Sequence, residues 1–164
     1  MWEVKQVIND DPRYDHAYLP ISGDPLLLSP ARDLIFSSSP PSNLVSIQTL
    51  GGTGANHLGA LLICRSNPTT KTRVWISDPT WTNHHEIWDL IGAKREVYPY
   101  FDPLTKKLDF NGMMTALERA EKGDVVLLHA CCHNPTGVDP TKEQWIAIAD
   151  LMARRGLIPF LDAA

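Results

Sequence analysis

A short apolar segment, residues 125–130, is the feature that most constrains what this chain can fold into. Its residues do not alternate between apolar and polar, so a strand at this place should be covered on both faces. Further strands are predicted at residues 73–77, 96–100 and 157–161, with helical patterns at residues 86–91 and, capped by Asn111, at residues 111–122. Strands that alternate with helices are typical of a mainly parallel sheet with helices on both faces. The sequence therefore predicts an α/β fold.

Capping signals locate two more helices. Asp24 followed by Pro25 predicts a helix start, and a run of serine and proline ends that helix near residue 37. Thr141 and Gln144 have the spacing of a capping box, and Gly156 is placed to end the helix that follows.

Composition excludes several classes of protein. The 164 residues carry 15 basic and 19 acidic side chains, a formal net charge of -4, with no basic stripe for a nucleic acid backbone. No apolar run approaches the roughly 20 residues that span a bilayer, and the N-terminus lacks the layout of a signal peptide. Three cysteines, with Cys131 and Cys132 adjacent, indicate reduced thiols. We expect a cytoplasmic protein, or a mitochondrial one if an N-terminal signal has been lost.

Four glycine-turn residues, 51–54, follow a predicted apolar strand at residues 45–50. They lead into a helix expected to bury Leu58, Leu61 and Leu62. Exposed N–H groups at the positive end of a helix bind anions, and a phosphate there would gain roughly 0.3–1 kcal/mol from the helix dipole. The spacing matches neither a P-loop nor a dinucleotide fingerprint. A tight turn without a ligand stays the alternative.

A polar cluster, residues 129–137, begins where the apolar strand ends. Ligands of open α/β sheets gather at such carboxyl ends. A zinc site is disfavoured because adjacent strand residues point to opposite faces. A Cys–His nucleophile pair is also disfavoured, and Cys131 and Cys132 are expected to be buried like small apolar residues.

Two other positions follow predicted strands. Trp81 offers an aromatic face beside His84 and His85, either to stack on a flat ligand or to pack in the core. Asp162 ends the strand at residues 157–161, where a carboxylate needs a cationic or hydrogen-bonding partner unless it caps a further helix.

Five motifs in this order resemble the aspartate aminotransferase family, the pyridoxal-phosphate-dependent enzymes of fold type I. They read YLPISG, QTLGGTGA, WTNH, HACCHNPTG and FLDAA, at residues 18–23, 48–55, 81–84, 129–137 and 160–164. The resemblance runs from about Tyr18 to the last residue. It implies that residues 24–164 are part of the cofactor-binding large domain, that residues 1–23 lead into it, and that the small domain and C-terminal half lie outside the chain.

The resemblance implies a cofactor, pyridoxal 5'-phosphate. Gly52 and Thr53, with the backbone of Gly51, would hold its phosphate. The tyrosine that matches Tyr18 reaches the phosphate in the other subunit, so the resemblance also implies a homodimer.

It implies roles for the cofactor ring as well. Trp81 would stack on the ring and help to place the substrate carboxylate, and Asn134 would bond the ring's 3-oxygen and approach the same carboxylate. Asp162 would pair with the protonated ring nitrogen. Three histidines would hold these residues in place without touching the cofactor: His84, His129 and His133.

The sequence departs from the family pattern at two motif positions. Gly51 stands where most members carry serine, and Cys132 where alanine is usual. The family's Schiff-base lysine and its two arginines for phosphate and α-carboxylate would follow the last residue. None of the seven lysines present occupies a matching context, so no catalytic residue is assigned.

The activity implied for the longer parent protein is exchange of an amino group between an amino acid and a 2-oxo acid. L-aspartate and 2-oxoglutarate are the expected pair, with an aromatic aminotransferase as the alternative. An inactive truncated remnant is the competing reading for the 164 residues alone.

Overall fold

A computed structural model describes residues 2–12, 18–37, 40–66 and 72–164. The chain divides into two compact units, Met1–Leu50 and Gly51–Ala164. The boundary expected after residue 23 differs from this division and stays a prediction.

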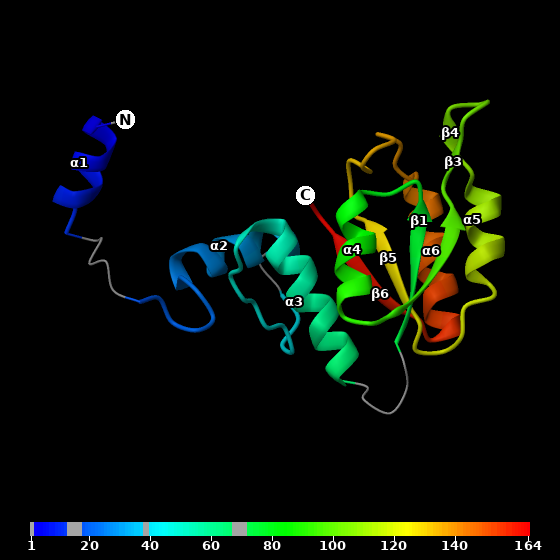
Figure 1. Ribbon diagram of the computed structural model, residues 1–164, viewed down its shortest axis with the longest axis horizontal. Helices are drawn as coiled ribbons and strands as arrows, with labels where there is room; N and C mark the ends of the chain where they lie inside the picture. The colour runs from blue at the N-terminus through cyan, green and yellow to red at the C-terminus, as the bar shows by residue number, and fades with distance from the viewer. Residues whose placement is uncertain (1, 13–17, 38–39, 67–71) are drawn as a thin grey trace. The chain divides into compact units, whose positions relative to one another are not determined.

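In the described residues of the first unit there are two helices, α1 (Trp2–Asp10) and α2 (Pro25–Phe36) (Figure 1). As predicted, Asp24 caps α2, because its carboxylate accepts a hydrogen bond from the Leu26 N–H at 2.8 Å. Gln48 ties the segment after α2 to the segment before it. Its N–H donates to the Ser22 carbonyl, and its side-chain oxygen accepts from the Asp24 N–H, both at 2.8 Å.

The strand predicted at residues 45–50 is wrong. The segment has no strand partner among the described residues, and Val45 and Leu50 are 79% and 96% exposed. An apolar pattern cannot form a strand without a ladder to join. The glycines that follow are likewise not a separate turn, because helix α3 (Gly51–Ser66) begins at once.

The second unit is built on a four-stranded sheet with the order β2-β1-β5-β6, and all neighbouring strands are parallel (Figure 1). The strands are β1 (Arg73–Asp78), β2 (Lys94–Pro99), β5 (Val125–His129) and β6 (Ile158–Asp162). Every residue of β5 is buried, as its apolar sequence predicts. A short antiparallel pair, β3 (Phe101–Asp102) and β4 (Lys107–Leu108), follows β2.

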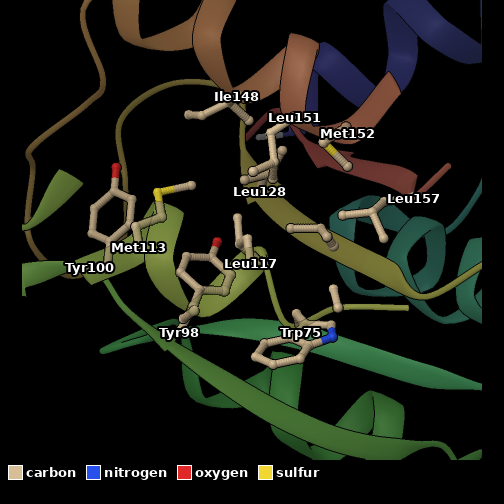
Figure 2. Packing of buried hydrophobic residues seen from close by; sticks show 13 residues of the cluster. Trp75, Tyr98, Tyr100, Met113, Leu117, Leu128, Ile148, Leu151, Met152 and Leu157 are labelled. Atoms are coloured by element: carbon tan, nitrogen blue, oxygen red, sulfur yellow. The ribbon is translucent and has the colours of Figure 1, made fainter. Parts of the chain in front are cut away.

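Helices cover both faces of this sheet. On one face, α5 (Phe110–Leu117) and α6 (Lys142–Arg155) pack over a cluster that contains Trp75 and Leu128 (Figure 2). On the other, α3 and α4 (Thr82–Leu90) pack over Ile76 and Leu127. Neighbouring strand residues thus serve opposite cores, which confirms the predicted mainly parallel α/β sheet covered on both sides.

The helix caps confirm some predictions and correct others. Thr141 and Gln144 form the predicted capping box, and Gly156 ends α6 with a left-handed φ of 65°. The helix predicted over residues 111–122 instead runs from Phe110 to Leu117. Asp109 caps it, with its carboxylate accepting from the Gly112 N–H at 2.9 Å.

The buried face of α3 also differs from the expectation. Leu58 and Leu62 are 42% and 64% exposed, whereas Asn56 and Ala60 are buried. The leucine positions did not predict the buried face of α3, because the helix approaches the sheet where only small side chains fit. A Cβ atom on Gly59, for example, would lie 2.8 Å from the Phe160 ring.

None of the helices in the described ranges is both long and apolar enough to cross a membrane.

Candidate functional site

The topology of the sheet sets the place of the candidate site. From β1 the chain continues through α4 to β2, and from β5 it continues through α6 to β6, on the other side of the sheet. Chain direction therefore diverges between the carboxyl ends of β1 and β5 (Figure 1). Open α/β sheets bind ligands at this kind of switch point.

A cavity of about 270 Å³ lies there. This volume is just below the range typical of small-molecule pockets. Its walls come from the start of α3, the ends of β5 and β6, and the loops after β1 and β5. The lining residues are Gly52, Asn56, Trp81, His129, Cys131, Cys132, Asn134, Asp162 and Ala164. The structure thus brings together five residues predicted from the sequence: Gly52, Trp81, His129, Asn134 and Asp162.

A chain of side-chain hydrogen bonds lies beneath this cavity. Asp162 Oδ2 is 2.9 Å from His84 Nε2, and His84 Nδ1 is 2.8 Å from the Thr80 hydroxyl. The same hydroxyl is 3.1 Å from His129 Nε2. The Asn134 N–H donates to His129 Nδ1 at 3.3 Å. We call this chain of hydrogen bonds, from Asp162 through His84, Thr80 and His129 to Asn134, the relay. It links the loops after β1 and β5 to the end of β6, and it supplies the partner that Asp162 was expected to have.

The backbone N–H of Asn134 determines the direction of every bond in the relay. An N–H can only donate, so His129 Nδ1 must accept, and a neutral His129 then carries its proton on Nε2. That proton goes to the Thr80 oxygen, which leaves the Thr80 hydroxyl to donate to His84 Nδ1. His84 is therefore protonated on Nε2 and donates to Asp162.

The two histidines of the relay are held neutral at neutral pH. Burial lowers the pKa of His84, although the hydrogen bond to Asp162 opposes this effect. Burial likewise lowers the pKa of His129 to about 4. A neutral His84 donates a hydrogen bond to Asp162 without cancelling its charge, so an ionised Asp162 places a full negative charge at the cavity wall.

A third histidine, His133, lies deeper and is 1% exposed. Its ring stacks on Tyr100 with centroids 3.7 Å apart, and its two nitrogens contact the hydroxyls of Ser77 and Thr136 at 3.1 and 2.9 Å. Burial lowers its pKa to about 4. His133 thus anchors the loop after β5 without reaching the cavity.

One carboxylate fixes the backbone of the same loop. Asp139 accepts hydrogen bonds from the N–H groups of Cys132 and His133 at 2.8 and 2.9 Å. The two cysteines there, Cys131 and Cys132, are exposed. The expectation that they are buried is therefore wrong, because the buried strand ends at His129 and both cysteines lie in the loop that follows. The Cys132 backbone adopts a left-handed φ of 52°.

The start of α3 contributes the remaining wall. N–H groups in the first turn of a helix, such as those of Gly52 and Thr53, have no partner inside the helix. A Cβ atom on Gly52 would meet nothing within 4 Å, so the approach to this backbone is open. One turn further, Asn56 donates to the Gly52 carbonyl at 3.0 Å, and its Oδ1 is buried without a hydrogen-bond partner.

Some predicted residues lie elsewhere. Thr53 lines a neighbouring cavity of about 570 Å³ between α3 and α4, while Gly51 opens α3. Tyr18 belongs to the first unit and is fully exposed. His84 and His133 lie behind the cavity wall.

The contributors that were not predicted include Thr80, Asn56 and Asp139. Of these three, only Asn56 could have been found from the sequence, since it lies four residues after Gly52 and thus on the same helix face. Thr80 contacts His129, which lies 49 residues away in the sequence, and no local sequence pattern predicts that contact.

Comparison with known proteins identifies relatives of the whole chain. The family model for aminotransferase class I and II matches residues 3–164. The L-tyrosine:2-oxoglutarate aminotransferase of Aspergillus ustus is 46% identical over 98% of this chain and 32% of its own length. The cytoplasmic aspartate aminotransferase of Saccharomyces cerevisiae is 40% identical over 98% of this chain and 39% of its own length.

Solved structures agree with these relatives. An aromatic-amino-acid aminotransferase from Burkholderia pseudomallei, covalently bound to pyridoxal phosphate, superposes with a TM-score of 0.89 at 41% identity. The match covers 99% of this chain and 40% of that one. The chain therefore spans about two fifths, or less, of the length of these proteins.

Proposed function

Since the chain belongs to the class I and II aminotransferase family, we propose that its cavity is part of a pyridoxal phosphate site. The whole protein would then transfer an amino group between an amino acid and a 2-oxo acid. The observation that carries the proposal is the relay beneath Asp162, which holds an anionic acceptor at the wall of a cavity that also contains an aromatic face.

The residues of the cavity fit this cofactor. Asn56 Oδ1 is a buried acceptor without a protein partner, so a polar ligand group would satisfy it. The open backbone at Gly52 fits a phosphate at the start of α3. Thr53 would add its hydroxyl to the phosphate, and the Gly51 backbone would complete the turn around it.

Asp162 would recognise the ring nitrogen. Its Oδ2 is engaged by His84, and its charge favours a protonated nitrogen in a ligand. When bound, pyridoxal phosphate supplies an electron-accepting ring for the electron pair that an amino acid releases as it loses its α-proton. Asp162 would keep that ring cationic, and the relay through Thr80 to His129 would keep Asp162 in place.

Trp81 and Asn134 would orient the ring and the substrate. Trp81 packs edge-on against His84, with centroids 5.2 Å apart and planes at 88°, and this contact limits rotation of the indole. Asn134 follows the relay directly, because its own N–H binds His129. Its side chain lines the cavity and would bond the ring's 3-oxygen and a substrate carboxylate.

No lysine is among the residues that line this cavity in the described part of the chain. A primary amine that could bind the cofactor covalently is therefore not provided by the described walls. We expect the 164-residue chain alone to have negligible aminotransferase activity and to bind the cofactor only reversibly.

L-aspartate and 2-oxoglutarate are the proposed substrates of the longer protein. An aromatic amino acid is the second candidate, since the similar proteins include tyrosine and aromatic-amino-acid aminotransferases. A homodimer in which Tyr18 reaches the partner's phosphate, and a cytoplasmic or else mitochondrial location, complete the proposal.

Substrate profiling of a longer protein that contains this chain tests the proposed activity. Amino acid consumption would be followed with 2-oxoglutarate as the acceptor, for aspartate, phenylalanine and tyrosine in parallel. Turnover of aspartate at the highest kcat/KM supports the proposed pair. Turnover of aromatic substrates alone would replace aspartate with the second candidate, and no amino transfer to any 2-oxo acid would reject the function.

A further inference from the structure

Two adjacent thiols at the cavity form a group that the proposed function does not use. Cys131 and Cys132 both line the cavity and are both exposed. Both residues are adjacent in the chain and border the same cavity, so the two thiols are available to one ligand. The remaining cysteine, Cys64, is half-buried on α3, packs against the core between the sheet and α3, and is not among the residues that line the cavity.

The backbone holds this pair in its arrangement. Cys132 has a left-handed φ of 52°, and its N–H is bound to Asp139 Oδ2 at 2.8 Å. Few L-residues adopt this conformation without support. The Asp139 carboxylate provides that support, so the backbone between the two cysteines and His133 is held in one conformation.

A direct disulfide is not the natural bond for such a pair. Cα atoms of adjacent residues are about 3.8 Å apart in a trans peptide, below the separation of about 4.4–6.8 Å usual for disulfides. An atom inserted between the two sulfur atoms removes this constraint, because the sulfur atoms then remain apart. Soft thiol ligands select soft, thiophilic centres.

We propose that Cys131 and Cys132 form a dithiol site for trivalent arsenic and related thiophilic metalloids at the edge of the cavity. With an organoarsenic oxide, each sulfur replaces one bond of the arsenic–oxygen double bond. Two As–S bonds form, and the two thiol protons leave with the oxygen as water. Arsenic stays trivalent, so the step needs no oxidant or reductant. The site does not depend on which ligand the cavity holds.

Cys131 enters this step as a neutral thiol. The hydrogen bond to Cys132 raises the pKa of the Cys131 thiol, so this group is protonated at neutral pH. It therefore brings its own proton for the water that leaves.

Phenylarsine oxide and intact mass spectrometry test the proposal on the full chain. The wild type and a Cys64→Ala control should each gain one phenylarsenic group and lose two titratable thiols. The adduct should survive an excess of a monothiol and be removed by a dithiol, because release from two sulfur atoms is needed. Cys131→Ala and Cys132→Ala should each reduce the monothiol-resistant adduct from one per chain to none.

Cys132→Ser keeps a side chain of nearly the same size, and it should lose the adduct as Cys132→Ala does. Circular dichroism of each variant verifies that its fold is retained. A monothiol-resistant adduct that persists in both Cys132 variants would overturn the proposal, and so would a wild-type chain that binds no arsenical or loses it to the monothiol.

Discussion

Replacing Thr80 with valine tests the relay beneath Asp162 in the most direct way. Valine has the shape of threonine without the hydroxyl, and that hydroxyl joins His84 Nδ1 at 2.8 Å to His129 Nε2 at 3.1 Å. The variant therefore removes two hydrogen bonds and little volume. His84 Nε2 would still donate to Asp162, so the variant isolates the loss of the two bonds to the hydroxyl.

The magnitude follows from the exposure of the two rings. His84 is 0% exposed, so its Nδ1 would be left buried without a partner, at a cost of about 1–3 kcal/mol. His129 is 8% exposed and faces the cavity, where water can replace the lost bond at little cost. We expect the free energy of unfolding to fall by about 2 kcal/mol, roughly a thirtyfold change in the unfolding equilibrium.

Urea unfolding and nitrogen NMR of the histidine rings provide the assay. Thr82→Val, at an exposed position at the start of α4, is the matched control and should change stability by less than about 0.5 kcal/mol. In the wild type, His84 should carry its proton on Nε2, and Thr80→Val should keep this tautomer because the ionised Asp162 carboxylate can only accept. A wild-type His84 protonated on Nδ1, or a Thr80→Val variant as stable as the control, would refute the relay.

Three further predictions concern the loop, the buried histidines and the chain alone. Asp139→Asn should leave the N–H of Cys132 or His133 without its acceptor and destabilise the protein by about 1–3 kcal/mol. Amide exchange at those two residues should become faster. The control Asp150→Asn, on the surface of α6, should change neither the stability nor the exchange rates. Because burial lowers the pKa of His129 and of His133 to about 4 in the folded state, the unfolded chain binds more protons between pH 6.5 and 4. The free energy of unfolding should thus decrease as the pH falls through that window, and a flat profile in urea titrations would contradict the predicted burial. Borohydride treatment of the 164-residue chain with pyridoxal phosphate should leave no stoichiometric adduct on a single lysine, and such an adduct in a mass spectrum would show that the chain itself supplies the amine.

Sequence patterns predicted the elements whose signals are local. The capping box at Thr141 and the left-handed Gly156 depend on residues three or fewer positions apart, and both are present. The strand at residues 45–50 failed because strand formation depends on a partner that a single segment does not reveal. The helix after residue 108 was shifted because Asp109 and Asn111 are both good caps, and only the backbone decides between them.

In the candidate site, too, some features could be predicted from the sequence and others could not. Gly52, Trp81, Asn134 and Asp162 follow strands or open a helix, and parallel topology gathers such positions at one edge of the sheet. The relay could not be predicted, because it depends on side-chain distances between residues far apart in the chain. The exposure of the adjacent thiols was also missed, since the sequence does not reveal that the buried strand ends at His129.

The central claim is that Asp162 provides an anionic partner for the ring of pyridoxal phosphate. Calorimetric binding of pyridoxamine 5'-phosphate tests it most directly, because this probe needs no lysine. Asp162→Asn retains an acceptor for His84 and removes only the charge, while Asp150→Asn removes an exposed charge on α6 that does not line the cavity. We predict measurable binding by the wild type and by Asp150→Asn, and at least tenfold weaker binding by Asp162→Asn, equivalent to about 1.4 kcal/mol. Equal affinities for the wild type and Asp162→Asn would contradict the claim.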